Sequence, residues 1–251
     1  MNYILAYDVG TTGVKTCLFE VGEEIRLLEG VTRGYPLYIM DNGGVEQDGD
    51  DWWNAMCEST RELFGKVSIK PSEILGISFC SQMQGLVLVD RDGKPVHRPM
   101  SYMDQRAKQE YRKGIANGIQ IGGANIFKAI PSIIITGAIP GSVKDPVWKY
   151  NWVKNKEPEN YKRIYKWLDV KDYLILRCTG RFVMTQDSAF ATMIFDSRKG
   201  HMRWSPKMNR MTGVDEKHLP DIIKSTDMAG KLTAKAASEL GLVEGIPVFG
   251  G

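Results

Sequence analysis

The amino-terminal stretch Tyr3-Ile-Leu-Ala-Tyr-Asp-Val-Gly-Thr-Thr-Gly-Val-Lys-Thr-Cys-Leu-Phe-Glu20 holds two apolar runs separated by glycines and threonines. The first run predicts a strand that ends at Asp8, and residues 15–20 predict a second strand, so together they form a hairpin with a glycine-bounded loop. Small residues let the backbone N–H groups of such a loop approach phosphate oxygens. Because Mg²⁺ prefers one or two carboxylates plus water, Asp8 is placed to hold it there. The alternative is a plain hairpin turn with an exposed acid.

The rest of the chain predicts one continuous mixed α/β domain. Further strands are expected at residues 25–32, 74–79 and 86–89. A helix is expected to open at Asp48 and to end at Gly65, because its apolar residues recur with helical spacing. The second half predicts helices at residues 145–155, 158–165, 171–178, 206–211 and 232–239. We interpret the lysine-rich segment 144–171 as a solvated helical face.

Composition excludes several classes of protein. The 251 residues are 43% hydrophobic and 25% charged, as in a soluble globular protein, and the net charge is only +3. So small a basic excess gives no reason to expect a nucleic acid or an acidic membrane as a partner. The four cysteines predict buried reduced thiols, and the three histidines lack metal-site spacing. Without a signal peptide or a spanning segment, we expect a cytoplasmic location.

Three polar stretches predict a site for a polyhydroxylated ligand, whose hydroxyls need both donors and acceptors. They are Gly44-Val-Glu-Gln-Asp-Gly-Asp-Asp-Trp-Trp53, Ser81-Gln-Met-Gln-Gly85 and Asp104-Gln-Arg106. Trp53 has the shape to back the apolar face of a sugar, although core packing of Trp52 and Trp53 is the favoured interpretation. For Asp104 and Arg106, a salt bridge at the start of a helix is an equal alternative.

Taken in order, these motifs resemble the FGGY carbohydrate kinases, which are the sugar kinases of the actin-like ATPase superfamily. The xylulokinase and gluconate kinase branches are the most similar. The resemblance rests on residues 8–15, 46–53, 82–85, 104–106, 171–180 and 241–251, and it covers essentially the whole chain. It implies an α/β, actin-like (ribonuclease H-like) domain with a mixed sheet flanked by helices.

The resemblance also implies a function, which is transfer of the γ-phosphoryl group of MgATP to a hydroxyl of a small sugar, ketose or polyol. ATP and Mg²⁺ are the implied cofactors. The implied roles are a catalytic, metal-binding Asp8, ATP phosphates beside Gly10, Thr11, Thr12 and Lys15, and a sugar beside Met83, Gln84, Asp104 and Arg106. The general-base aspartate is expected just beyond Gly251, so residues 1–251 would be the sugar-binding half and a C-terminal nucleotide-binding domain would be its partner.

Some features depart from the resemblance or leave it open. Many xylulokinases have a histidine where this chain has Gln84, so the sugar is not specified. Residues 122–143 match no pattern and are expected to form an insertion near the cleft that the resemblance implies between the two domains. Asp187 is expected to cap a helix. A non-catalytic sugar sensor and an actin-like assembly ATPase remain alternatives, and a homodimer stays open.

Overall fold

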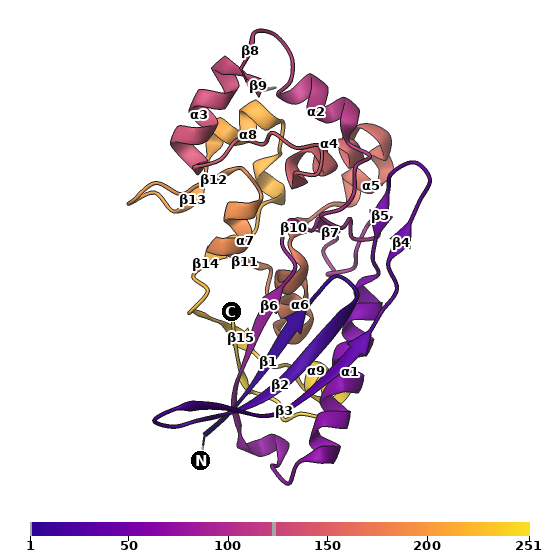
Figure 1. Ribbon diagram of the computed structural model, residues 1–251, viewed down its shortest axis with the longest axis vertical. Coiled ribbons are helices and arrows are strands. Elements are labelled where there is room, and N and C mark those ends of the chain that lie inside the picture. Colours follow the sequence, from indigo (N-terminus) through magenta and orange to yellow (C-terminus); the bar gives the residue numbers. More distant parts are fainter. Residues whose placement is uncertain (1, 122–123) are drawn as a thin grey trace.

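The computed structural model describes residues 2–121 and 124–251 of the chain (Figure 1). The strands are β1 Asn2–Val9, β2 Gly13–Val21, β3 Ile25–Gly34, β4 Tyr38–Ile39, β5 Val45–Glu46, β6 Ile74–Ser81, β7 Val87–Val89, β8 Gln120–Ile121, β9 Ala124–Asn125, β10 Lys166–Leu168, β11 Val183–Thr185, β12 Phe195–Asp196, β13 Arg203–Trp204, β14 Asp221–Ile223, β15 Met228–Lys231 and β16 Pro247–Phe249. The helices are α1 Gly49–Lys66, α2 Lys108–Gly114, α3 Ile126–Thr136, α4 Pro146–Lys156, α5 Pro158–Arg163, α6 Val170–Thr179, α7 Gln186–Ala191, α8 Pro206–Thr212 and α9 Ala234–Leu240, with short 3₁₀ turns at Pro71–Glu73 and Glu216–His218.

A six-stranded mixed sheet in the order β15-β16-β6-β1-β2-β3 organises one end of the molecule (Figure 1). The predicted amino-terminal hairpin is confirmed, because β1 and β2 pair antiparallel while β1 and β6 pair parallel. Tyr3, Leu5, Tyr7 and Val9 of β1 are buried, whereas Asp8 is exposed on the opposite face. This alternation follows from the period-2 geometry of a strand.

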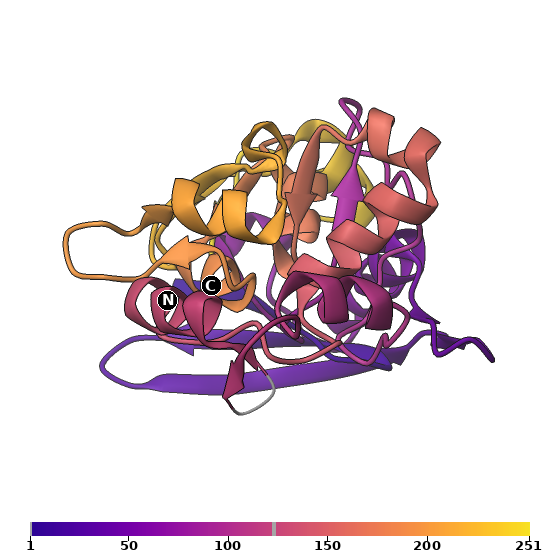
Figure 2. The ribbon, with the colours of Figure 1, turned by 90° about the horizontal axis from the view of Figure 1, so that it is seen from above.

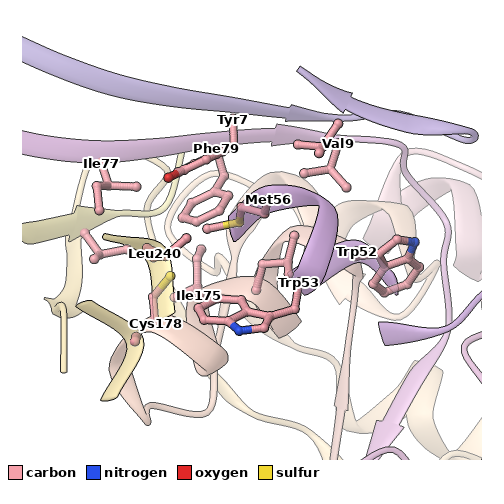
Figure 3. Packing of buried hydrophobic residues seen from close by; sticks show 14 of the residues in the cluster. Tyr7, Val9, Trp52, Trp53, Met56, Ile77, Phe79, Ile175, Cys178 and Leu240 are labelled. Atoms are coloured by element: carbon pink, nitrogen blue, oxygen red, sulfur yellow. The ribbon is translucent and has the colours of Figure 1, made fainter. Parts of the chain in front are cut away.

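The buried face of the sheet packs against α1, α6 and α9. Figure 3 shows the side chains of Met56, Phe79 and Ile175 gathered between the sheet and these helices. Trp52 and Trp53 of α1 are only 1% and 3% exposed, which confirms the core-packing interpretation and leaves neither ring free for a sugar. Helix α1 begins after the Asp48 cap as predicted, but it continues past Gly65 and ends at Lys66.

A second apolar cluster fills the other end of the molecule, where α2–α5, α7 and α8 lie (Figure 1). Tyr150 stacks on Trp167 with ring centroids 5.4 Å apart. Figure 2 shows the indigo strands along one side of the molecule and the helices of this second half on the other. The predicted solvated face of segment 144–171 is wrong in part, because Lys149 and Lys171 are buried.

Other expectations need correction. Cys57 and Cys178 are buried thiols as predicted, but Cys80 is exposed and Cys17 is half-buried, since both lie on the less covered face of the sheet. Of the predicted insertion, residues 122–123 lie outside the described part, and most of the remainder forms β9 and α3. Among the described residues, no helix has the length and apolar character needed to cross a membrane.

Leu5→Ala should test the burial of the sheet. The Leu5 side chain is fully buried, so truncation is expected to lower the free energy of unfolding by about 2–5 kcal/mol, the usual cost of a core cavity. Leu27→Ala in β3 is the matched control, because that leucine is 49% exposed. Urea unfolding followed by circular dichroism measures both, and equal losses would contradict the burial pattern.

Candidate functional site

Tyr35 holds the loop between β1 and β2 from one side. Its hydroxyl donates to the carbonyl oxygens of Gly10 at 2.6 Å and Gly13 at 3.0 Å, and its backbone N–H donates to that of Thr12 at 3.0 Å. Gly13 must be a glycine here, since a Cβ would lie 2.8 Å from a backbone oxygen of β3. Tyr35 therefore turns most of the loop's carbonyl groups toward the protein.

Two glutamines hold the same loop from the other side. Gln47 donates through Nε2 to the carbonyl oxygen of Thr11 at 2.8 Å. Gln82 donates through Nε2 to Gly10 at 3.1 Å and to the Oε1 of Gln47 at 2.9 Å. All four carbonyl oxygens of residues 10–13 are thus occupied by protein donors. No acceptor among the described residues takes the N–H groups of Thr11 and Thr12.

Asp8 lies at the edge of this loop, where β1 ends. Its register partners are Lys15 on β2 and Cys80 on β6, so these side chains share the exposed face. Its carboxylate makes no hydrogen bond or ion pair with any residue that the structure describes. A free carboxylate beside free amides suits Mg²⁺, which prefers few protein ligands together with water and phosphate oxygens. Within the described residues, no group of three or more His, Cys, Asp or Glu side chains could form a protein-only metal cage.

The turn after β6 has an unusual backbone. Gln84 has a φ of +61°, in the left-handed region that non-glycine residues rarely adopt. The N–H groups of Gln84 and Gly85 donate to the two carboxylate oxygens of Asp169 at 3.1 and 3.0 Å. The carbonyl oxygen of Gln84 accepts a hydrogen bond from Lys149 Nζ at 2.6 Å. Met83 is 58% exposed, so the turn presents this side chain to solvent.

Asp104 and Arg106 form a buried ion pair with each other. This is the salt bridge predicted from the sequence as the alternative to sugar binding. Asp104 is fully buried, and its Oδ2 accepts the N–H of Val45 at 2.9 Å and the Nε of Arg106 at 3.0 Å. Arg106 Nη2 also lies 2.8 Å from a carboxylate oxygen of Glu46, and the guanidinium lies over the ring of Trp152 at 4.6 Å. Both carboxylate oxygens of Asp104 already have protein donors, and contact of this pair with a sugar stays a prediction.

Backbone pairing through residues 99–100 brings the polar segments together. Leu86 and Met100 exchange N–H···O bonds of 2.9 and 3.0 Å, and the N–H of Gln47 donates to the carbonyl of Pro99 at 2.9 Å. Gln47 and Gln82 then join these segments to the β1–β2 loop. The loop, the turn after β6 and the Asp104 network therefore form one continuous region.

Sequence reasoning missed the residues that support this region. Asp169 follows β10 and caps α6, so a polar residue after an apolar run was its only signal. No pattern in the sequence distinguishes Lys149 from the other lysines around it.

The expectation for Asp187 is wrong, because the cap of α7 is Thr185. The Asp187 carboxylate instead accepts hydrogen bonds from Lys171 Nζ at 2.5 Å and Ser225 Oγ at 2.6 Å.

A cavity of about 680 Å³ borders this region at Pro99 and lies between the start of α1, the 92–99 segment and α6. Asp48, Gly49 and Asp50 of the predicted 44–53 stretch line it, but the β1–β2 loop, the 83–85 turn and the Asp104–Arg106 pair do not. Its charges largely neutralise one another, as Arg177 pairs with Asp50 at 2.6 Å. We therefore do not assign it to the candidate site.

The mixed sheet with its flanking helices has the actin-like fold. The model of the FGGY family of carbohydrate kinases, N-terminal domain, matches residues 3–251, so the chain belongs to this family.

Relatives agree with this assignment. The chain is 29% identical to a xylulose kinase of Staphylococcus xylosus and 30% identical to a probable L-xylulose kinase of Haemophilus influenzae, in each case over its whole length and 49% of the relative. A ligand-bound xylulose kinase structure from Lactobacillus acidophilus superposes with a TM-score of 0.85 at 26% identity, covering all of this chain and 48% of the other. The chain thus spans about half the length of these relatives.

Proposed function

We propose that this chain is the sugar-binding half of an ATP-dependent kinase that phosphorylates a hydroxyl of a small sugar, ketose or polyol. The observation that supports it best is the β1–β2 loop, with its carbonyl groups turned inward, two unpaired amides and the free Asp8 carboxylate at its edge. A hairpin turn without a ligand has no need for this arrangement. The FGGY membership supports the same reaction class.

Phosphoryl transfer depends mostly on positioning and charge stabilisation. The amides and hydroxyls of Thr11 and Thr12 would bind phosphate oxygens, and the Lys15 ammonium, on the same face as Asp8, would add positive charge. Asp8 would hold the hydrated Mg²⁺, which neutralises charge on the phosphates when it is bound. Met83 and Gln84 would contact the sugar from the neighbouring turn, because the Gln84 side chain has no partner among the described residues.

The same proposal places the general base and most of the nucleotide site in a C-terminal half. We therefore propose no general base for the hydroxyl proton among the described residues near Asp8. Closure of the two halves around both ligands would exclude water and limit ATP hydrolysis.

The substrate screen uses the protein in its natural length, including any segment that follows Gly251. We expect ATP turnover that depends on one member of a panel of D-xylulose, L-xylulose, D-gluconate and glycerol, measured by coupled ADP release. The 251-residue chain alone is the control, and it should show no sugar-dependent turnover.

Calorimetric titration of the same panel separates the alternatives. Sugar binding without turnover in the natural-length protein would indicate a sensor, and ATP turnover without sugar binding would indicate an assembly ATPase. Robust turnover by the 251-residue chain would show that the base lies within it.

A further inference from the structure

We propose that Lys149 and Asp169 form a buried clamp that sets the backbone of the 83–85 turn and so positions Met83 and Gln84 for the sugar. Both act through the turn, as positioning residues. The inference rests on the proposed function for its sugar, but the state of the turn can be measured without any sugar.

Asp169 accounts for the left-handed backbone of Gln84. A non-glycine residue in that region is strained and persists only where surrounding contacts determine its backbone. The Asp169 carboxylate supplies them, because its two oxygens accept the consecutive N–H groups of Gln84 and Gly85. A Cβ on Gly85 would lie 2.8 Å from Asp169 Oδ1, so the glycine permits this close approach.

Lys149 holds the opposite side of the turn. Its side chain is entirely buried on α4, and its Nζ donates to the carbonyl oxygens of Gln84 at 2.6 Å and Ser101 at 2.9 Å. Among the described residues, no carboxylate oxygen lies within 4 Å of this ammonium. A buried charge whose direct contacts are neutral carbonyl groups is costly, and a long apolar side chain would fill the same space without that cost. Only a hydrogen-bond donor at this position can hold the carbonyl groups of Gln84 and Ser101 in place.

The surrounding charges stabilise this arrangement from a distance. Burial lowers the pKa of Lys149 to about 8. The carboxylates of Asp104, Asp169 and Asp145 raise that pKa, whereas Arg106 lowers it. Burial likewise raises the pKa of Asp169 to about 7. The two residues thus belong to one coupled buried group.

The clamp also sets the distance between two parts of the candidate site. The carbonyl oxygen of Ser101 that receives Lys149 also accepts the N–H of Asp104 at 3.1 Å. Lys149 therefore ties the 83–85 turn to the segment that leads into the Asp104–Arg106 pair. A change at Lys149 should move the turn relative to that pair without touching the β1–β2 loop.

The kinetic test is Lys149→Met in the natural-length protein. Hydrogen bonds from a charged donor contribute about 1.5–3 kcal/mol. For the sugar of the panel that the protein phosphorylates, KM should therefore rise roughly 10- to 100-fold. KM for ATP should change less than about 2-fold, because the loop that faces ATP keeps its own supports. Lys154→Met is the matched control: Lys154 lies on the same helix and donates to the carbonyl of Gly213 at 2.9 Å, away from the turn. It should leave both KM values unchanged.

Hydrogen exchange on the 251-residue chain tests the turn without a sugar. Peptides that contain Gln84 and Gly85 should exchange faster in Lys149→Met and in the milder Asp169→Asn, and should be unchanged in Lys154→Met. Thermal melting checks that each variant is folded, and Asp169→Asn replaces Lys149→Met if the latter is not.

The outcomes separate the two proposals. Unchanged exchange in the turn, an unchanged sugar KM, or equal rises in the sugar and ATP KM values would each overturn the clamp. If the natural-length protein phosphorylates no sugar, the proposed function fails together with the sugar-positioning role, whatever the exchange data show.

Discussion

Asp8→Asn in the natural-length protein should lower kcat by about 100- to 1000-fold, the loss typical of removing a group that stabilises transition-state charge. The substitution keeps the size of the side chain but removes the charge that would hold hydrated Mg²⁺. Sugar affinity, measured by calorimetry, should change less than about 2-fold, because Asp8 lies at the loop and not at the 83–85 turn. Asp8 is exposed and unpaired among the described residues, so folding should be unaffected.

Asp41→Asn is the control for this prediction. Asp41 is an exposed carboxylate in the turn between β4 and β5, outside the candidate site. It should retain wild-type kcat. Normal phosphoryl transfer by Asp8→Asn would remove the metal role of Asp8.

Asp104→Ala should cause a large loss of stability. It leaves the Arg106 guanidinium, 6% exposed, with only Glu46 as a carboxylate partner. Breaking a buried ion pair by removing one partner costs about 3–5 kcal/mol. For a domain of this size we expect the melting temperature of the 251-residue chain to fall by roughly 10 °C.

The chain contains a matched control with the same Asp-x-Arg spacing. Asp196 binds Arg198 through Nε at 2.8 Å and Nη2 at 2.6 Å, but that arginine is 43% exposed. Because water can solvate the remaining guanidinium, Asp196→Ala should cost only about 1 kcal/mol. A wild-type melting temperature for Asp104→Ala, together with weaker sugar binding by the natural-length protein, would instead make Asp104 a sugar ligand.

The parts of the site that could be predicted were local in the sequence. The Asp8 strand end and its loop lie within eight residues, and their spacing alone predicts the hairpin that the structure confirms. The Asp104–Arg106 pair is also local, but its spacing leaves two interpretations open. Burial of both side chains, together with Glu46 and Trp152 from distant segments, accounts for the ion pair.

The supports of the site could not be predicted, because each depends on contacts between distant segments. Gln47 lies 36 residues from Thr11, and Lys149 lies 65 residues from Gln84. In the sequence, Lys149 is one of many lysines in a charged segment, which favours a solvated face. Only the packing of α4 against the turn shows that its ammonium is buried.

Short-range periodicity and glycine spacing predict the strand–loop–strand unit, because both act within a few residues. The order of the motifs along the chain carries the resemblance to the FGGY family, which the family model confirms. Only the tertiary structure shows which polar side chains are exposed and unpaired among the described residues and which are buried supports of the fold. Asp8 and Asp104 look alike as acids beside strands or turns, yet one carboxylate is exposed and unpaired among the described residues while the other is fully buried and bonded. The physical reason is that a buried carboxylate must be paired, and its partners come from segments far apart in the chain.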